Sequence, residues 1–379
     1  MPSHDNPAGT PKCSKLPSGQ HMALVRIIDA NANRASEGLR VIEDFARFAL
    51  DDRFLTSGYK ELRHDLAQTL AAISESQRLM ARETTEDVGT RISARDEYER
   101  ADLAEIALVN QKRVEQALRC IEEYAKAISA DMAAQIERLR YRSYTLSRAI
   151  HISHRSRRQL DGRRLYVLID AGTSPESLAA FGRLLAQAGV HVLQLREKSL
   201  CDRELLTRAR ALREATRDLG TTLILNDRVD LALMADADGV HLGQADLPVK
   251  EARALLGPDR LIGVSTHSLS QACQAVLEGA NYIGCGPTFP STTKHFANFP
   301  GTDFLSEVSR QISLPAFAIG GIDAANLDEV LQAGFSRIAV SGAVTGAEDP
   351  AEIVRQFVSR LQPRVDRQST TETQGGTAP

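Results

Sequence analysis

RRLYVLIDAGTSPESLAAFGRLLAQAGVHVLQLREK (163–198) decides the fold, because it contains a short apolar run, a longer amphipathic run and a second short apolar run. LYVLID (165–170) and HVLQLRE (191–197) have the length and the aliphatic content of buried strands. Residues 175–188 between them place apolar side chains at the spacing of a helix. Two strands joined by a helix pair in parallel, so the stretch predicts a βαβ unit.

The same alternation continues to residue 362. An open doubly wound sheet would usually carry a GxGxxG turn after its first strand, whereas the first strand here ends in Asp170-Ala171-Gly172. Eight strands, each followed by a helix-length segment, instead predict an α/β fold, a closed (βα)8 or TIM barrel over residues 163–362. The six further strand-like runs are TTLILND (221–227), GVHL (239–242), LIGVSTH (261–267), YIGCGPTF (282–289), PAFAIGG (315–321) and RIAVSG (337–342).

Residues 21–150 have helical periodicity and few glycines or prolines, so we expect an all-α helical domain before the barrel. This domain contains an internal repeat, which predicts two equivalent amphipathic helices packed in an antiparallel bundle. Arg40 and Asp44 lie one turn apart and predict a solvated surface pair. The repeat consists of NANR (31–34) and LRVIEDFA (39–46), which recur as NQKR (110–113) and LRCIEEYA (118–125).

Basic residues gather in HISHRSRRQLDGR (151–163), where the apolar periodicity stops, and predict a solvated linker over residues 151–162. The polar ends, residues 1–20 and 363–379, are expected to be disordered.

The composition excludes several classes of function. The formal net charge is −3, so no overall basic field favours nucleic acid or an acidic membrane surface. No apolar run approaches the roughly 18 residues that span a bilayer. The five cysteines are scattered and form no CxxC pair, which argues against a disulfide framework and a zinc site. We expect a cytoplasmic protein that acts on small molecules; a homo-oligomer is compatible with the sequence.

Polar residues follow the predicted strands, whose ends open on one catalytic face of a barrel. Asp227 and Asp246 follow neighbouring strands, and two such carboxylates can share a divalent ion, typically Mg²⁺. Capping of the following helices is the alternative role for both residues. Arg196, Lys198 and Lys294 follow strands that open on the same mouth. Acids and bases around one cavity suit a metal–pyrophosphate complex, which favours the metal.

The ends of the last two strands predict a phosphate site. Small residues at Gly320-Gly321 and Ser341-Gly342 let backbone N–H groups approach a phosphate closely, although a glycine pair can also simply make a tight turn. STTK (291–294) offers hydroxyls and a lysine, which favours an anion-binding lid over a plain polar loop.

Three further polar residues could take part in the chemistry. His241 lies inside a strand, where packing is the commoner role, and His267 ends a strand and could touch a substrate. We expect no activating base beside Ser265, so we interpret it as a hydrogen-bond partner and not a nucleophile.

Six motifs in register resemble thiamine-phosphate synthase, and the resemblance covers residues 163–362. Six matches in order are far more specific than likeness of fold alone. The motifs are QLREK (194–198), ILNDRVDLAL (224–233), ADGVHLGQADLP (237–248), IGVSTHS (262–268), YIGCGPTFPSTTK (282–294) and AIGGI (318–322).

The resemblance implies a transferase that joins hydroxymethylpyrimidine diphosphate to a thiazole phosphate and releases pyrophosphate. It implies that Asp227 and Asp246 bind one Mg²⁺ ion and that Arg196, Lys198 and Lys294 assist the leaving group. The pyrimidine diphosphate would be held by Gln194, Leu195, Arg196, Glu197, Lys198, Asn226, Ser265 and Lys294, and the thiazole phosphate by Ser291, Thr292, Thr293, Gly321, Ser341 and Gly342.

The N-terminal half also resembles a known module. EGLRVIEDFAR (37–47) and RETTEDVG (82–89) are similar to a helical module fused upstream of this synthase in some bacteria and associated with phosphorylation of hydroxymethylpyrimidine phosphate. The chain has no GxxxxGK[ST] loop. Arg82, Asp87 and Gly89 fit either a phosphate-binding loop or an interhelical turn. A kinase and a structural or dimerising bundle are therefore both open for this half.

Two rival functions stand beside the synthase. A thiazole tautomerase uses a similar barrel, but resemblance to that family would imply loss of the metal aspartates and the pyrophosphate cations, all of which are present. The other rival is a non-catalytic sensor of a phosphorylated ligand.

Overall fold

The computed structural model describes residues 17–83, 99–290 and 299–362. Ser291, Thr292, Thr293 and Lys294 lie outside the described residues, as do the chain ends 1–16 and 363–379. Within the described part, no helix is both long enough and apolar enough to cross a membrane.

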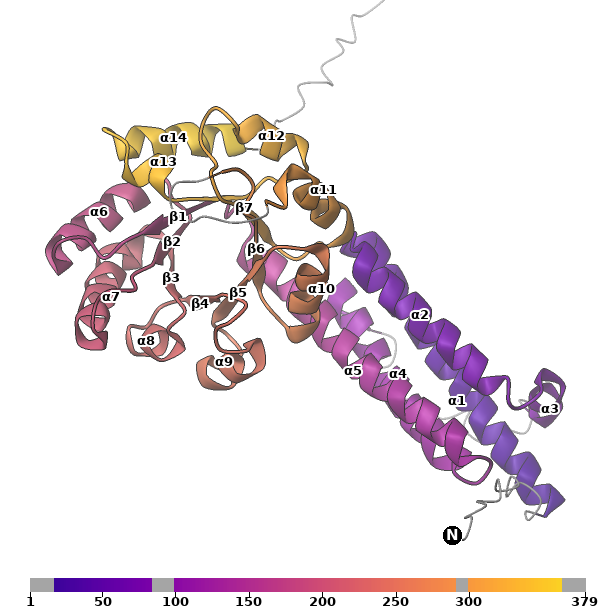
Figure 1. Ribbon diagram of the computed structural model, residues 1–379. Helices are drawn as coiled ribbons and strands as arrows, with labels where there is room; N and C mark the ends of the chain where they lie inside the picture. The colour runs from indigo at the N-terminus through magenta and orange to yellow at the C-terminus, as the bar shows by residue number, and fades with distance from the viewer. Residues whose placement is uncertain (1–16, 84–98, 291–298, 363–379) are drawn as a thin grey trace, which may run out of the picture.

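The C-terminal part is a closed barrel of eight parallel strands, as predicted, and Figure 1 shows helices surrounding it. Closure is made by β1 and β8, with Tyr166 paired to Ala339. The strands are β1 (Leu165–Ile169), β2 (Val192–Leu195), β3 (Thr222–Asn226), β4 (Gly239–Leu242), β5 (Leu261–Thr266), β6 (Tyr282–Cys285), β7 (Ala316–Ile319) and β8 (Ile338–Val340).

Each strand has one face toward the barrel interior and one toward the helices, because successive side chains alternate. In β1, Val167 belongs to the layer between strands and helices, whereas Tyr166 packs in the interior with Tyr282 and Phe317. The surrounding helices are α6 (Pro175–Ala188), α7 (Asp202–Thr216), η4 (Arg217–Leu219), α8 (Val229–Met234), α9 (Val249–Leu256), α10 (Leu269–Glu278), α11 (Gly301–Gln311), α12 (Leu327–Gln332), α13 (Gly342–Thr345) and α14 (Pro350–Leu361).

The N-terminal part is a helical bundle, again as predicted. Its two halves correspond to the internal repeat, with α1 and α2 in one copy and α4 and α5 in the other. The strongest packing joins α1 to α4, which are the two helices that carry the repeated motifs. The elements are α1 (Ser18–Asp44), the π-helical η2 (Phe45–Ala49), α2 (Arg53–Leu70), α3 (Glu75–Ala81), α4 (Leu103–Ala125) and α5 (Ala130–Gln159).

Each copy of the repeat contains a buried glutamate that binds arginines, and the prediction of a solvated pair between Arg40 and Asp44 did not include it. Arg40 does contact Asp44, but it also lies 3.2 Å from Glu43, whose carboxylate is buried and is bound by Arg63 at 3.0 Å. The second copy repeats the arrangement: Glu122 is held at 2.6 Å by both Arg119 and Arg140. The expected solvated pair is therefore the rim of a buried ion-pair cluster.

The expected linker over residues 151–162 is wrong, because α5 continues through Gln159 and its Ser153 and Ser156 are buried. The basic residues here hold the two domains together. Arg155 donates to the carbonyl of Pro258 at 3.1 Å, and Ser156 Oγ accepts from Asn281 of the barrel at 3.0 Å. The charge cluster is thus part of the interface between domains.

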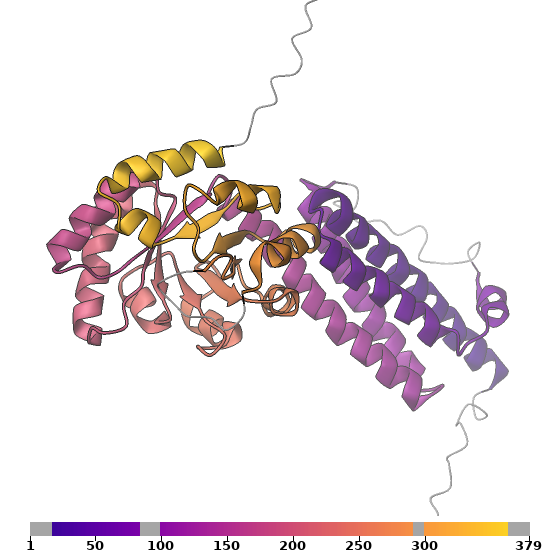
Figure 2. The same ribbon diagram turned by 45° about the horizontal axis from the view of Figure 1, so that its top comes forward.

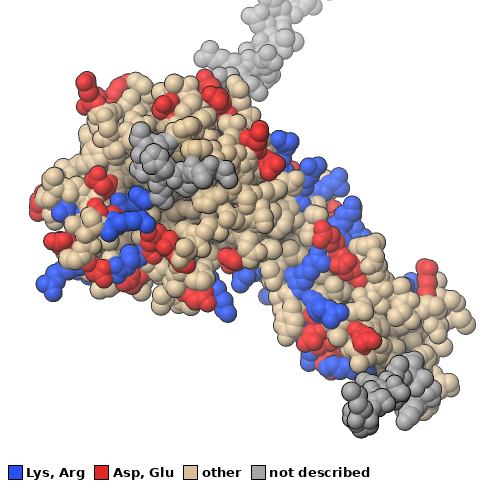
Figure 3. Space-filling view, viewed as in Figure 1, with Lys and Arg blue, Asp and Glu red and all other residues tan. Residues whose placement is uncertain are grey.

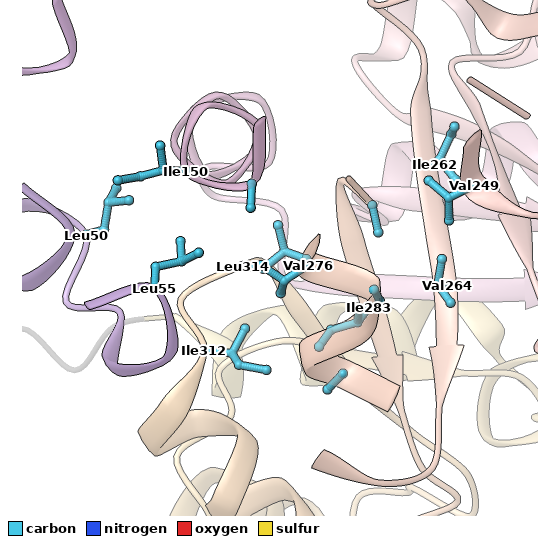
Figure 4. Close-up of a cluster of buried hydrophobic side chains, with 14 of the residues drawn as sticks. Leu50, Leu55, Ile150, Val249, Ile262, Val264, Val276, Ile283, Ile312 and Leu314 are labelled. Atoms are coloured by element: carbon cyan, nitrogen blue, oxygen red, sulfur yellow. The ribbon is translucent and has the colours of Figure 1, made fainter. Parts of the chain in front are cut away.

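An apolar cluster continues across this interface. Leu50, Leu55 and Ile150 of the helical domain face Ile312 and Leu314 of the barrel (Figure 4). Figure 2 shows the bundle leaving the barrel as an elongated arm.

A buried carboxylate also fastens the bundle to the barrel. Asp52, which caps α2 through the N–H of Leu55, accepts from the N–H and the hydroxyl of Ser313, each at 2.9 Å. Burial raises the pKa of Asp52 above its ordinary value, against the lowering effect of these donors.

Candidate active site

The mouth of the barrel contains a cavity of about 150 Å³ that opens where the strands end. It gathers side chains from most of the strands. Its described lining consists of Tyr166, Leu168, Gln194, Arg196, Lys198, Asn226, Asp227, His241, Gly243, Asp246, Ser265, Tyr282, Gly284, Phe317, Ile319 and Ala339. Eight sequence-predicted site residues are therefore brought together: Gln194, Arg196, Lys198, Asn226, Asp227, Asp246, Ser265 and His241.

Asp227 and Asp246 both line this cavity. Asp227 follows β3 with a φ of 59°, a left-handed conformation that aspartate tolerates better than most residues. Its N–H donates to the carbonyl of His241 at 2.9 Å, which anchors the turn. Oδ2 of Asp246 accepts from the N–H of Gly243 at 2.6 Å, so this carboxylate is fixed by its own loop.

Two cationic side chains lie beside these acids. Lys198 Nζ lies 3.0 Å from Asp227 Oδ2, with most of the lysine side chain exposed. Arg196 lines the same cavity, and its backbone N–H is held at 2.9 Å by the carbonyl of Ile169 at the end of β1. Figure 3 shows acidic and basic side chains interspersed on the visible face, without one dominant sign.

A chain of buried hydrogen-bonding groups crosses the base of the cavity. Gln194 Nε2 donates to the hydroxyl of Tyr166 at 2.6 Å, and the Tyr166 and Tyr282 hydroxyls lie 3.1 Å apart. The Tyr282 hydroxyl lies 3.3 Å from Nδ1 of His241, whose Nε2 lies 2.9 Å from Ser265 Oγ. The chain fixes the orientation of every side chain in it.

One end of this chain has no partner. Oε1 of Gln194 is buried and makes no hydrogen bond within the part of the chain that the structure describes. A buried acceptor without a donor costs about 1–3 kcal/mol. Because Gln194 lines the cavity, a bound ligand with an N–H or O–H group would remove this cost.

His241 stands next to Ser265, contrary to our expectation that no base lies there. Burial lowers the pKa of His241 to about 4, so the ring is neutral at neutral pH. Its other nitrogen faces the Tyr282 hydroxyl and not a carboxylate, so the pair lacks the third group of a nucleophilic triad. Ser265 therefore keeps the expected role of a hydrogen-bonding residue, and His241 both packs and lines the site.

Three other predicted contact residues occupy supporting positions in the described structure. Leu195 is fully buried and is absent from the described lining of the cavity. Glu197 Oε1 accepts from the N–H groups of Lys198 and Ser199, both at 2.7 Å, and these donors lower the pKa of Glu197, led by Ser199. His267 Nδ1 lies 2.5 Å from the carbonyl of Gly286, so it braces the loop after β6.

The predicted phosphate corner is built from the ends of β7 and β8. Gly320 and Gly321 have φ values of 100° and 66°, and a Cβ on Gly321 would lie 2.5 Å from the carbonyl oxygen of Pro290. Glycine is therefore required where this turn meets the loop after β6. Ser341 Oγ donates to the carbonyl of Leu168 at 3.0 Å, and α13 begins immediately afterwards at Gly342.

Sequence reasoning missed the aromatic floor of the cavity. The rings of Tyr166, Tyr282 and Phe317 meet with centroids 5.3–6.0 Å apart. The period-two alternation of each strand could have assigned these residues to the interior. Only closure of the barrel brings β1, β6 and β7 together.

The comparisons with known proteins cover both domains. A protein of Rhodopirellula baltica named thiamine-phosphate synthase is 42% identical over 368 residues, which are 94% of this chain and 98% of that protein. The chain belongs to the thiamine-phosphate synthase family. A second synthase of this name, from Thermosynechococcus vestitus, is 40% identical over 91% of this chain and 97% of its own. The resemblance found in the sequence is therefore confirmed, and it extends through the helical domain.

Two family models match separate parts of this synthase-family chain. Residues 165–344 match the family described as thiamine monophosphate synthase, and residues 26–149 match the ThiD2 family. Among solved structures, a thiamine phosphate pyrophosphorylase from Pyrococcus furiosus is 34% identical, covers 54% of this chain and 98% of its own, and has a TM-score of 0.48. The description of the N-terminal family names no reaction, so the kinase and the structural bundle both stay predictions.

Proposed function

We propose that the barrel joins the exocyclic methylene carbon of hydroxymethylpyrimidine diphosphate to the nitrogen of a thiazole phosphate. The carbon–oxygen bond to the diphosphate breaks, a carbon–nitrogen bond forms, and thiamine phosphate and pyrophosphate result. The observation that carries the proposal is that Asp227, Asp246, Arg196 and Lys198 line one cavity beside the buried amide of Gln194. The names of the relatives support the same reaction.

The charges of the lining support a role for a divalent cation. Asp227 and Asp246 balance Arg196 and Lys198, so the described lining offers no net positive charge to a diphosphate. The described residues contain no cluster of three or more His, Cys, Asp or Glu side chains that could hold a metal. Two carboxylates suit Mg²⁺, because Mg²⁺ takes few protein ligands and completes its shell with water and phosphate oxygens. When bound there, Mg²⁺ would neutralise charge that develops on the departing pyrophosphate.

The chain's own residues would then orient the substrate. Gln194 Oε1 would accept a hydrogen bond from the amino group of the pyrimidine, above the floor of Tyr166 and Tyr282. Arg196 and Lys198 would donate to the diphosphate, with Lys198 leaving Asp227 when the metal and substrate enter. Proximity and electrostatic stabilisation of the leaving group provide most of the rate, and no base is required for the dissociative step.

The thiazole phosphate would occupy the corner formed by the ends of β7 and β8. The N–H groups at Gly321 and at Ser341-Gly342 would donate to it, together with Ser291, Thr292 and Thr293. Lys294 would complete the cationic side of the leaving group, and Asn226 and Ser265 would contact the pyrimidine diphosphate. We also propose a cytoplasmic location, because the five cysteines are scattered without a disulfide pattern.

The full-length protein with the two substrates and Mg²⁺ tests the proposal. We expect thiamine phosphate and pyrophosphate in equal amounts, and the loss of both products when Mg²⁺ is chelated. Conversion of a thiazole phosphate tautomer without pyrophosphate release would instead favour the tautomerase, against which the retained acids and bases already argue. Binding of either substrate with no turnover would favour the sensor.

A further inference from the structure

The helical domain has a concavity of its own, between α1 and α4, with a volume of about 480 Å³. Matching positions of the internal repeat line it. Asn31, Arg34 and Gly38 of α1 meet Asn110, Arg113 and Ala117 of α4. Nothing in the reaction of the barrel uses these residues. We propose that this concavity binds the diphosphate group of a small molecule, with Arg34 and Arg113 each holding one phosphoryl group.

The two arginines are available for a ligand. In the part of the chain that the structure describes, no ion pair or side-chain hydrogen bond engages Arg34 or Arg113, and both are exposed. By contrast, Arg40 and Arg119, further along the same two helices, bind glutamates. A guanidinium group matches the oxygen geometry of a phosphoryl group through paired N–H donors.

The asparagines are fixed in the same way in both copies. Nδ2 of Asn31 donates to the carbonyl of Ile27, and Nδ2 of Asn110 to the carbonyl of Ile106, each at 2.9 Å. A side-chain amide nitrogen carries two hydrogens, so the second N–H of each amide is left for a ligand. Each half of the concavity therefore offers one arginine and one oriented amide.

The base of the concavity is shaped by a close approach of the two helices. A Cβ on Gly38 would lie 2.7 Å from Val114 Cγ2 and 3.2 Å from the carbonyl oxygen of Asn110. Glycine at this position thus lets α1 and α4 approach until their side chains enclose a shared space. The approach brings the two half-sites onto one ligand.

The equivalence of the half-sites selects the ligand. The repeat relates α1 to α4, so the two arginines stand as approximate counterparts in one concavity. A diphosphate presents two neighbouring phosphoryl groups, so each half can hold one of them, and its larger charge and greater number of acceptor oxygens favour it over a single phosphate shared by the two arginines. The volume leaves room for an organic group attached to the diphosphate.

One pair of lining residues breaks the equivalence. Glu37 of α1 corresponds to Gln116 of α4, and both line the concavity. The Glu37 carboxylate repels an anion, so Glu37→Gln should strengthen diphosphate binding by about fivefold even with the full dielectric screening of bulk water. A groove that is merely solvated would show no such change.

Calorimetric titration of the full-length protein with inorganic pyrophosphate tests the proposal. The titration is run with EDTA, because the barrel site is proposed to need a divalent cation for a diphosphate. We expect one pyrophosphate per chain, with orthophosphate at least tenfold weaker. Arg34→Ala and Arg113→Ala should each weaken binding about tenfold or more, whereas Lys112→Ala, an exposed neighbour outside the lining, should change it less than twofold.

The outcomes separate this site from the barrel. Both arginine variants should keep the wild-type rate of thiamine phosphate formation, and an unchanged urea-unfolding transition shows that the helical domain folds. No binding in EDTA, or binding that neither arginine variant weakens, overturns the proposal. Equal affinities for orthophosphate and pyrophosphate overturn the two-phosphoryl arrangement.

Discussion

Replacement of Gln194 by leucine should change stability and activity in opposite directions. The side chain is 2% exposed, donates one hydrogen bond to Tyr166 and leaves Oε1 without a partner. Leucine loses that hydrogen bond, about 1 kcal/mol, but also removes the unpaired acceptor, which costs about 1–3 kcal/mol in the free protein. Tyr166 keeps the Tyr282 hydroxyl as a partner. We expect Gln194→Leu to be about 1 kcal/mol more stable than the wild type.

Activity should fall in the same variant, because the amino group of the pyrimidine would lose its acceptor. A hydrogen bond of about 1–3 kcal/mol corresponds to roughly 5–150-fold in kcat/KM. Urea-induced unfolding gives the first quantity, and steady-state pyrophosphate release gives the second.

Gln111 in the helical domain provides a matched control. It is 3% exposed, but it accepts from the Tyr59 hydroxyl at 3.0 Å and donates to Ser143 Oγ at 2.8 Å. Gln111→Leu leaves both buried hydroxyls without their glutamine partner and should lower the free energy of unfolding by about 2–4 kcal/mol, while the folded protein keeps its barrel activity. A Gln194→Leu variant that is destabilised as much as Gln111→Leu, or that retains full activity, would contradict the proposed role of the unpaired Gln194 oxygen.

Two further predictions concern the helical domain and its interface. In urea unfolding, Arg140→Met should destabilise the protein by about 3 kcal/mol and Arg63→Met by about 1 kcal/mol. The difference is expected because the Arg140 side chain is 9% exposed, whereas that of Arg63 is 34% exposed. Equal losses of stability would contradict the buried ion-pair account. The raised pKa of Asp52 means that the folded state binds the proton of this carboxyl group more readily than the unfolded state. The contribution of Asp52 to the free energy of unfolding is therefore fully present below the ordinary pKa of 3.8, and it is lost as pH rises through the folded pKa. Subtraction of the Asp52→Asn pH profile of unfolding free energy from that of the wild type should show this fall, and a difference that rises with pH would be inconsistent with it.

The sequence predicted the local elements well, because their signals are local. GVHL (239–242) is β4 and residues 175–188 are α6 without a change of boundary. The polar strand ends also predicted much of the cavity, since every parallel strand of a barrel delivers its end to one mouth.

What the sequence did not predict depends on contacts between distant segments. From the sequence, the basic residues around Arg155 predict a linker, because a charge cluster does not reveal that a barrel loop accepts its hydrogen bonds. The repeat showed that Arg34 and Arg113 are equivalent, but only the packing of α1 on α4 places them in one concavity. The sequence correctly predicts that His241 lies in a strand, but its contact with Ser265 depends on the register of β4 and β5.

The proposed metal-assisted departure of pyrophosphate is tested most directly by a Mg²⁺ titration of turnover in Asp227→Asn. Asparagine tolerates the left-handed backbone at this position, and the lost contact to Lys198 is largely exposed, so unfolding free energy should change by less than about 1 kcal/mol. We predict a fall in kcat/KM of about 100-fold or more and a higher Mg²⁺ concentration for half-maximal rate. A variant with the wild-type rate and the wild-type Mg²⁺ dependence would contradict the account.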